Sequence, residues 1–267
     1  MESLNVIDTH AHLDMSHFDV DRELVIARAS EAGVRLINTI GIDVESSRRA
    51  VSLAEKYPQI AASVGIHPGD ASKVERKDID QLEEIAGNPR VVAIGEMGMD
   101  LYRDPSLKNI QLQVFKWQLE LAEKAGKPII IHCRQAQEIV LPILEEWTAS
   151  HPAKGNPRGV LHCFNGDLTT AKKYIEMDFF IALGAYIGYP SSSQLREVVK
   201  NIPDEKLVIE TDCPFLPPQK LRGKRNEPSY ILATLGVLAE IKGWSLQQVA
   251  ALTMRNSIKL FDLSRFL

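Results

Sequence analysis

Short apolar runs alternate with amphipathic segments along the whole chain. Eight of these runs are rich in Val and Ile, which is typical of strands that helices cover on one face while a barrel core fills the other. Between them apolar residues recur at helical spacing, and Ser245 and Gln248 have capping-box spacing at the start of the last helix. The predicted strands are residues 5–10, 35–41, 60–67, 91–96, 128–132, 159–163, 179–184 and 206–211. The predicted helices are residues 22–32, 45–56, 79–86, 107–124, 135–147, 169–177, 194–199, 230–241 and 245–261.

Eight strands, each followed by a helix, predict an α/β fold, namely a single (β/α)8 TIM-type barrel. A doubly wound open sheet is the alternative, because strand order is not encoded in the pattern of one sequence. Polar residues at the strand ends favour the barrel. No linker or change of composition divides the chain, so we expect a single domain over residues 1–267.

Composition narrows the possible partners. The net charge of −4 gives no global electrostatic reason to bind nucleic acid, so such binding needs a local basic patch. The chain has no apolar run of membrane-spanning length and no signal-like N-terminus, which predicts a cytoplasmic protein without a membrane partner. Its cysteines, Cys133, Cys163 and Cys213, cannot form a disulfide framework, in agreement with a reducing compartment.

Metal-binding residue types recur where the predicted strands end. His10 and His12 follow the first strand, and residues at i and i+2 share one face of a strand. A single histidine at a strand end is more often a hydrogen-bonded structural residue than a ligand. Several imidazoles and carboxylates in one barrel mouth, however, would be costly to bury unless a pair of divalent metal ions balanced them. The other such residues are His67, Glu96, Asp100, His132, His162, Glu210 and Asp212.

Imidazole and carboxylate ligands without thiolate suit Zn²⁺ or Mn²⁺ better than an all-oxygen Mg²⁺ site. Glu96 has two oxygens with which to bridge two ions, and Asp212 can bind a metal and also accept a proton. Alternation should turn Cys133 and Cys163 away from the barrel interior and towards the helices, as small buried apolar residues.

A basic loop, "PQKLRGKRNEP" at 218–228, follows the last predicted strand. A solvated loop is the usual explanation for such a run, but this one should hang over the barrel mouth, where barrel enzymes often bind phosphate. We therefore favour phosphate binding here, with added positive charge from Arg103 and Arg134. The basic residues of the loop are Lys220, Arg222, Lys224 and Arg225.

The segments "IDTHAHLD", "VGIHP", "IGEMGMD", "IHCR", "LHCFNG", "IETDCPFL" and "RGKRNEP" together resemble the TatD family of metal-dependent hydrolases, in order and spacing, from residue 7 to residue 228. The resemblance implies hydrolysis of phosphodiester bonds in DNA, often as an exonuclease of the 3'-5' kind. It also implies a two-metal site, in which Glu96 serves both ions. One ion would be held by His10, His12, Glu96 and Asp212, and the other by Glu96, His132 and His162.

In the resulting hypothesis, Asp212 orients the attacking water and accepts its proton. Arg225 or Lys224 offsets the charge that develops on the phosphate, and Arg134 adds further positive charge near the substrate. His67 contacts the phosphate or protonates the leaving group. Two alternatives remain: a hydrolase of another ester, amide or small phosphorylated substrate on the same metals, and a binding protein that has kept the barrel. The choice among Zn²⁺, Mn²⁺ and Mg²⁺ also stays open.

Overall fold

The strands form a single parallel sheet in the order β1 to β8, in a computed structural model that describes residues 4–151 and 157–267. Each strand pairs with the next one along the chain, which excludes the doubly wound alternative. The predicted domain of residues 1–267 also includes residues 1–3 and 152–156, which lie outside the described part. The strands are β1 (Val6–Ala11), β2 (Val34–Ile40), β3 (Ile60–Val64), β4 (Val91–Asp100), β5 (Ile129–Arg134), β6 (Gly159–Leu161), β7 (Phe179–Leu183) and β8 (Leu207–Ile209).

The sheet closes between its first and last members. The amide of Asp212 donates to the carbonyl of His10 at 2.9 Å, and the amide of His12 donates to the carbonyl of Cys213 at 2.8 Å. A bridge between Ala11 and Cys213 lies at the same place. The (β/α)8 barrel is therefore confirmed, and its closing hydrogen bonds involve three residues of the predicted site.

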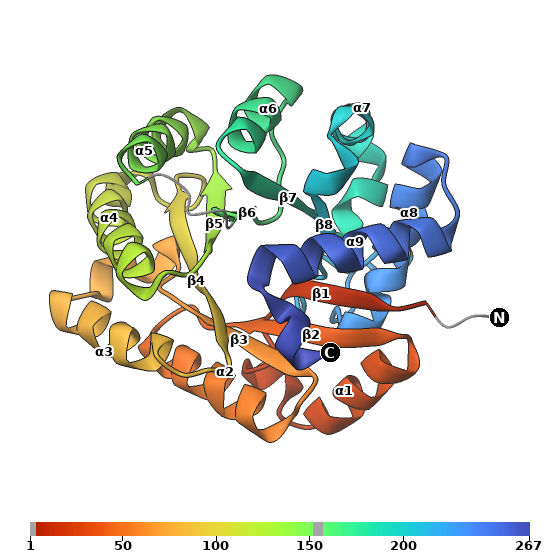
Figure 1. The fold of residues 1–267 in the computed structure, drawn as a ribbon, viewed down its shortest axis with the longest axis horizontal. Coiled ribbons are helices and arrows are strands. Elements are labelled where there is room, and N and C mark those ends of the chain that lie inside the picture. The colour runs from red at the N-terminus through yellow and green to blue at the C-terminus, as the bar shows by residue number, and fades with distance from the viewer. Residues whose placement is uncertain (1–3, 152–156) are drawn as a thin grey trace.

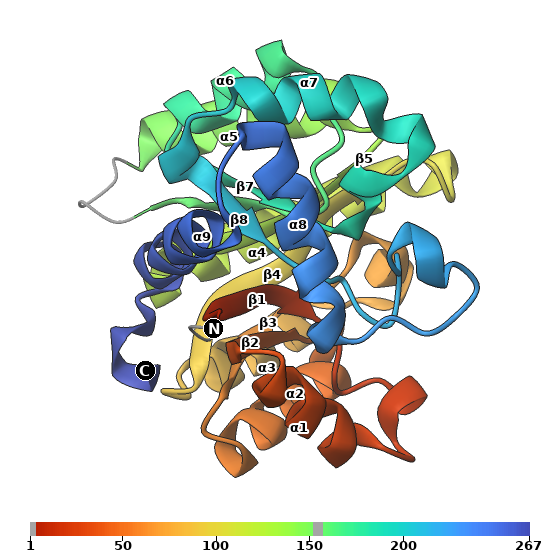
Figure 2. The ribbon, with the colours of Figure 1, turned by 90° about the vertical axis from the view of Figure 1, so that its right-hand side faces the viewer.

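The helices surround this barrel (Figures 1 and 2). The predicted capping box starts α9, because the Ser245 hydroxyl accepts from the amide of Gln248 while the Ser245 amide donates to the Gln248 side chain. Among the described residues, no helix is both long and apolar enough to cross a membrane. The helices are α1 (Arg22–Glu31), α2 (Val44–Lys56), α3 (Arg76–Ala86), α4 (Lys108–Ala125), α5 (Gln137–Ser150), α6 (Leu168–Glu176), α7 (Ser193–Asn201), α8 (Ile231–Lys242) and α9 (Leu246–Phe261).

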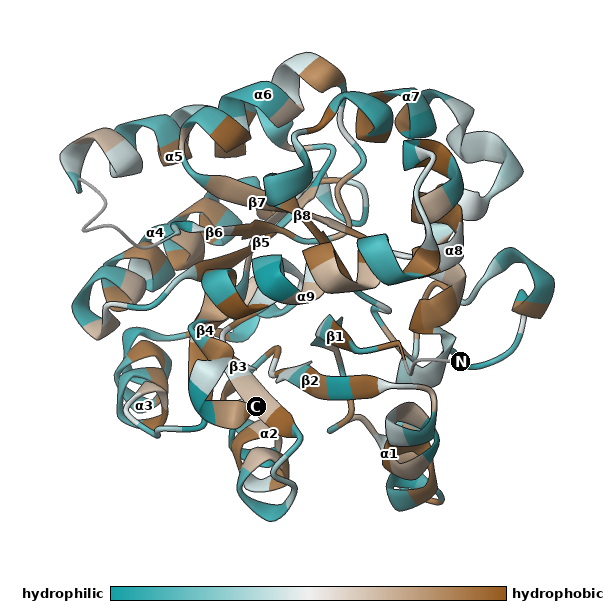
Figure 3. Ribbon diagram, turned by 45° about the vertical axis from the view of Figure 1, so that its right-hand side comes forward, coloured by the Kyte–Doolittle hydropathy of each residue, from teal (hydrophilic) through white to brown (hydrophobic). Residues whose placement is uncertain are grey.

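Two apolar layers hold the fold together. The larger one joins the helices to the outer faces of the strands, and in Figure 3 the strands are mostly brown while teal residues recur along the surrounding helices. A smaller cluster fills the barrel and is completed by Leu260 and Phe261 at the end of α9. Its strand members include Ile7, Leu36, Ala61, Val92, Ile130, Val160, Phe180 and Val208.

Two strands depart from a regular register beside the predicted ligands. The pairing of β1 with β2 shifts between Asp8 and Ala11, and that of β4 with β5 shifts between Ile94 and Met97. The first shift includes His10, and the second includes Glu96. Irregularities of this kind are common next to active sites, where they change the direction of a side chain.

Candidate metal centre

A cavity of about 900 Å³ opens at the carboxyl ends of the strands. Residues that follow all eight strands contribute to its wall, as expected for the functional face of this fold. Five of the six predicted ligands line it, and His10 lies beneath them with 1% of its surface exposed. The five are His12, Glu96, His132, His162 and Asp212.

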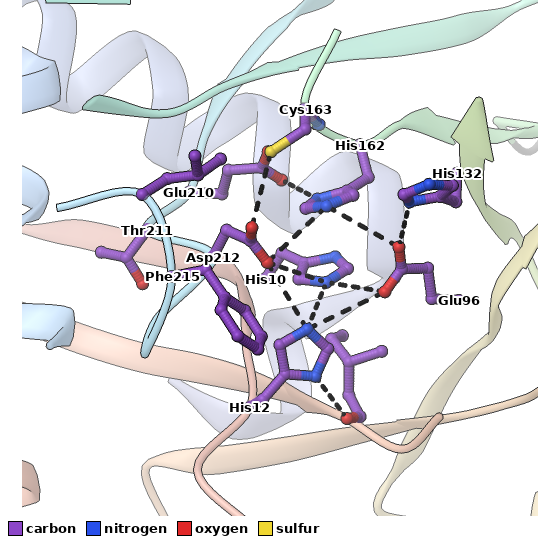
Figure 4. A network of polar contacts seen from close by, with 12 residues as sticks. His10, His12, Glu96, His132, His162, Cys163, Glu210, Thr211, Asp212 and Phe215 are labelled. Atoms are coloured by element: carbon purple, nitrogen blue, oxygen red, sulfur yellow. Dashed lines mark hydrogen bonds and ion pairs between the residues drawn. The ribbon is translucent and has the colours of Figure 1, made fainter. Parts of the chain in front are cut away.

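The innermost cluster comprises three histidines and two carboxylates (Figure 4). The Nε2 atoms of His10 and His12 are 3.3 Å apart, and both face the carboxylates of Glu96 and Asp212. The ring of His162 stacks on that of His10 with centroids 3.6 Å apart. All five residues are buried.

The spacing of these donor atoms suits a metal ion. Ligand atoms around a tetrahedral ion at the usual zinc distances lie about 3.4 Å from one another. From the His10 Nε2 atom, the nearest oxygens of Glu96 and Asp212 lie at 3.4 and 3.8 Å, and from the His12 Nε2 atom at 3.8 and 3.5 Å. Residues and geometry therefore fit a divalent ion.

Two of the predicted ligand rings are held from outside the cluster. The His12 Nδ1–H donates to the carbonyl of Ile40 at 3.0 Å, and the His162 Nδ1–H donates to the Glu210 carboxylate at 3.0 Å. Each ring thereby keeps its Nε2 atom turned into the site. Such outer hydrogen bonds fix the tautomer and orientation of a metal-binding imidazole.

His132 lies at the edge of this cluster. Its Nδ1 atom is 2.6 Å from Glu96 Oε1, and its Nε2–H donates to the Asp100 carboxylate at 3.3 Å. Besides Glu96, the potential ligands grouped with His132 are His67 and Asp100, whereas the ring centroid of His162 is 6.2 Å away. The structure thus brings the six predicted ligands to one cavity, with His132 at the edge of the cluster that the other five form.

Charges in the centre compensate one another. Burial alone would raise the pKa of Glu96, but His162, His67 and the other imidazoles hold it well below its usual range. Burial would lower the pKa of His162, yet the carboxylates of Glu210, Glu96 and Asp212 raise it to about 10. The pKa of His12 rises to about 8 through Asp212 and Glu96, against the effect of burial. Protons on the imidazoles therefore balance the negative charge of the buried carboxylates, a role that a bound cation would otherwise take.

The protonation state of His67 differs from that of the predicted ligands His12 and His162. Burial lowers its pKa to about 4, so the ring is neutral near pH 7. Its Nδ1 atom accepts from the amide of Gly69 at 2.9 Å, which leaves the Nε2 atom carrying the hydrogen. That atom lies 3.8 Å from Glu96 Oε1 and borders the cavity.

The expected orientation of Cys163 is wrong. Its sulfur lies 3.8 Å from Asp212 Oδ2 and borders the cavity, because β6 ends at Leu161 and Cys163 has a positive φ of 45° that interrupts the alternation. Burial raises the pKa of its thiol well above the usual range, so the sulfur is not a thiolate. Cys133, which also borders the cavity, lies beside the hydroxyl of Tyr174 in α6.

The basic loop does not line the cavity. Both terminal nitrogens of Arg225 pair with Asp21, at 2.7 and 2.8 Å, and Lys224 is exposed. In Figure 2 the light-blue loop between β8 and α8 extends outward from the barrel. Arg103 and Arg134 do border the cavity, and both are exposed.

The roles of some residues of the site are visible only in the structure. Asp100 and Glu210 were recognisable as acidic residues at strand ends, but only the structure shows that they hold His132 and His162. Tyr102 and Phe215 border the cavity as exposed aromatic residues. Tyr102 lies two residues after the motif that ends at Asp100, and Phe215 lies within the segment "IETDCPFL", which is the signal that the sequence offers.

Known proteins resemble the whole chain. A family model described as "TatD related DNase" matches residues 7–262. The metal-dependent hydrolase YabD of Bacillus subtilis is 41% identical over 97% of this chain and all of its own length. The 3'-5' ssDNA/RNA exonuclease TatD of Salmonella typhimurium is 36% identical, covering 96% of this chain and 99% of its own. The crystal structure of the TatD homolog YjjV from Escherichia coli superimposes with a TM-score of 0.90 at 31% identity, over 97% of this chain and 98% of its own. Sequence, fold and site thus agree that the chain belongs to the TatD-related DNase family.

Proposed function

We propose that this protein is a divalent-metal-dependent hydrolase that cleaves phosphodiester bonds, most specifically a DNase with 3'-5' exonuclease polarity on single strands. The observation that carries the proposal is the convergence of His10, His12, Glu96, His162 and Asp212 at the base of one open cavity. The named activity of the exonuclease TatD, and of other relatives that share its name, supports the choice of substrate.

Two metal ions are assigned to the centre. One of them would be held by His10, His12, Glu96 and Asp212, and the other by Glu96, His132 and His162. When bound, such ions lower the pKa of water and neutralise charge on a phosphate. Zn²⁺ and Mn²⁺ suit the imidazole-rich donor set, and Mg²⁺ is the remaining candidate.

Asp212 is the proton acceptor for the attacking water. Its carboxylate has one oxygen towards the histidines and the other towards the Cys163 thiol, and 12% of its side chain is exposed to the cavity. Burial would raise its pKa, but His162, His12 and His10 lower it, so the group is ionised and able to accept. The imidazoles likewise lower the pKa of Glu96, which remains ionised and would serve both ions.

The substrate phosphate lies among His67, Arg134 and the metal centre. Since His67 is neutral and carries its hydrogen on Nε2, it donates a hydrogen bond to the phosphate, and its low pKa disfavours a role as proton donor to the leaving group. Arg134 supplies a cation at the cavity wall. Arg225 would have to leave Asp21 to contact phosphate, so of the two residues it is the exposed Lys224 that serves the outer part of the substrate.

A cytoplasmic location is part of the proposal. Cys133, Cys163 and Cys213 are all free, as expected in a reducing compartment.

Hydrolysis of a labelled single-stranded DNA oligonucleotide tests the function. Metal-stripped protein receives Mg²⁺, Mn²⁺ or Zn²⁺, and His10→Ala and Asp212→Asn are assayed beside it. We expect metal-dependent shortening from the 3' end that both substitutions abolish, with Leu246→Ala, which changes an exposed residue outside the cavity, as the matched control. Metal binding without DNA cleavage would contradict the nuclease and move the substrate to another class of ester.

A further inference from the structure

Two exposed aromatic side chains border the cavity. Tyr102 is 58% exposed and Phe215 is 43% exposed, in a protein whose other large aromatic residues are mostly buried. Exposed aromatic area costs free energy in water, so its place beside a polar site calls for a partner. Both side chains line the wall of the cavity that contains the proposed metal ligands.

Phe215 is tied to the metal centre through its backbone. Its amide donates to the carbonyl of Asp212 at 2.9 Å, and its own carbonyl accepts from the Asn226 side chain at 2.7 Å. The ring meets the ring of His12 edge-on, with centroids 6.0 Å apart (Figure 4). A fixed backbone and an exposed ring make Phe215 a rigid apolar surface next to the reacting centre.

Tyr102 lies across the barrel mouth from Phe215. It follows β4 whereas Phe215 follows β8, and these strands are on opposite sides of an eight-stranded ring. The Tyr102 amide donates to Asp100 at 3.0 Å, which ties this residue to the carboxylate that holds His132. The Arg134 guanidinium lies over the tyrosine ring, 3.8 Å from its centroid. Aromatic and cationic surface are thus combined on this side.

We infer that Phe215 and Tyr102 are base-stacking platforms on either side of the cavity, which select nucleic acid with unpaired bases. The inference rests on the proposed phosphodiesterase function and names how that site recognises its substrate. With the scissile phosphate at the metal centre, the base of the terminal nucleotide stacks on Phe215. The preceding nucleotide reaches Tyr102, beside the Arg134 guanidinium that stacks on this ring. Stacking of this kind accepts any base but needs a free π face, which a base within a duplex does not offer.

Binding of two oligonucleotides tests the inference. Both carry a 5' fluorophore, and they differ only in that one ends in a 3' thymidine and the other in a 3' abasic nucleotide. Fluorescence anisotropy is measured on Mn²⁺-loaded Asp212→Asn protein, so that hydrolysis does not consume the ligand. Phe215→Leu, Phe215→Trp and the control Leu246→Ala are introduced into this background.

We expect Phe215→Leu to weaken binding of the thymidine-ended strand by about 5- to 150-fold and that of the abasic strand by less than about twofold. Phe215→Trp should retain the preference for thymidine, and Tyr102→Leu should weaken both strands because its base is not the terminal one. Equal binding of the two strands by the parent protein, or an equal loss for both with Phe215→Leu, would overturn the inference.

Cleavage assays separate this result from the proposed function. If the wild-type protein shortens DNA but Phe215→Leu leaves the preference for thymidine intact, the proposed nuclease activity stands and the stacking platform is refuted. A thymidine preference that depends on Phe215, in a wild-type protein that cleaves no DNA, would support the platform and contradict the nuclease. If the parent protein bound neither oligonucleotide, both proposals would be overturned.

Discussion

Metal binding should displace protons from the centre. Burial lowers the pKa of His162 and His12, but neighbouring carboxylates raise these values to about 10 and about 8 in the protein without metal. Near neutral pH both rings are therefore imidazolium ions. A metal ligand must be a neutral imidazole, so each ring has to release a proton before it can bind a cation.

The magnitude follows from the number of protons released. Each displaced proton makes the apparent binding constant rise about tenfold per pH unit while the group is protonated in the free protein. Below about pH 8 two protons are displaced, and the apparent affinity should rise about 100-fold per unit. Between about pH 8 and about pH 10 only His162 still contributes, and the slope should fall to about tenfold per unit. Affinity is thus lost as the pH falls, because both pKa values are raised in the free protein.

Isothermal titration of metal-stripped protein with Mn²⁺ measures this dependence. Titrations from about pH 6 to about pH 8, in two buffers of different ionisation enthalpy, give both the binding constant and the number of protons released. His17→Ala, which removes an exposed imidazole outside the predicted ligand set, should leave the slope unchanged. An affinity that does not change over this range, with no proton release, would refute the charge balance described for the centre.

Three other results are expected. Glu210→Gln removes the carboxylate partner of the His162 ring and should lower metal affinity about 10- to 100-fold in the same titration, with the fold unchanged by circular dichroism. Arg134→Ala should raise KM for single-stranded DNA about tenfold, whereas Arg225→Ala should change it less than about threefold because Arg225 is occupied by Asp21. A larger effect at Arg225 would contradict this assignment. Phe115→Ala, in the fully buried helix–barrel layer, should lower the free energy of unfolding by about 3–5 kcal/mol in urea denaturation, and a loss below about 1 kcal/mol would be inconsistent with its packing.

Much of the fold, and the meeting of the candidate ligands at one cavity, could be predicted because both depend on local pattern. Runs of Val and Ile marked the strands, and the residues at their ends had to meet at one face once the sheet closed. His10 and His12 kept their i, i+2 relation, although a register shift lies at His10. The strand predicted at 91–96 extends to Asp100, because pairing with β5 holds the Met-Gly-Met stretch in an extended conformation. This stretch lacks strand-forming residues, so its sequence alone does not predict the extension.

The remaining features depend on contacts that no local pattern contains. Cys163 faces Asp212 because β6 is only three residues long, so the alternation ends before it reaches the cysteine. Arg225 is drawn from the mouth by Asp21, which is 204 residues away along the chain. A charged loop in a sequence does not show which of its cations already has a partner.

Anomalous diffraction from crystals grown with Mn²⁺ tests the central claim most directly. The account predicts two peaks in the cavity. One should be bounded by His10, His12 and Asp212, the other by His132 and His162, with Glu96 between them. A peak outside this cluster, or no peak in crystals of protein that is active with Mn²⁺, would contradict the two-metal centre.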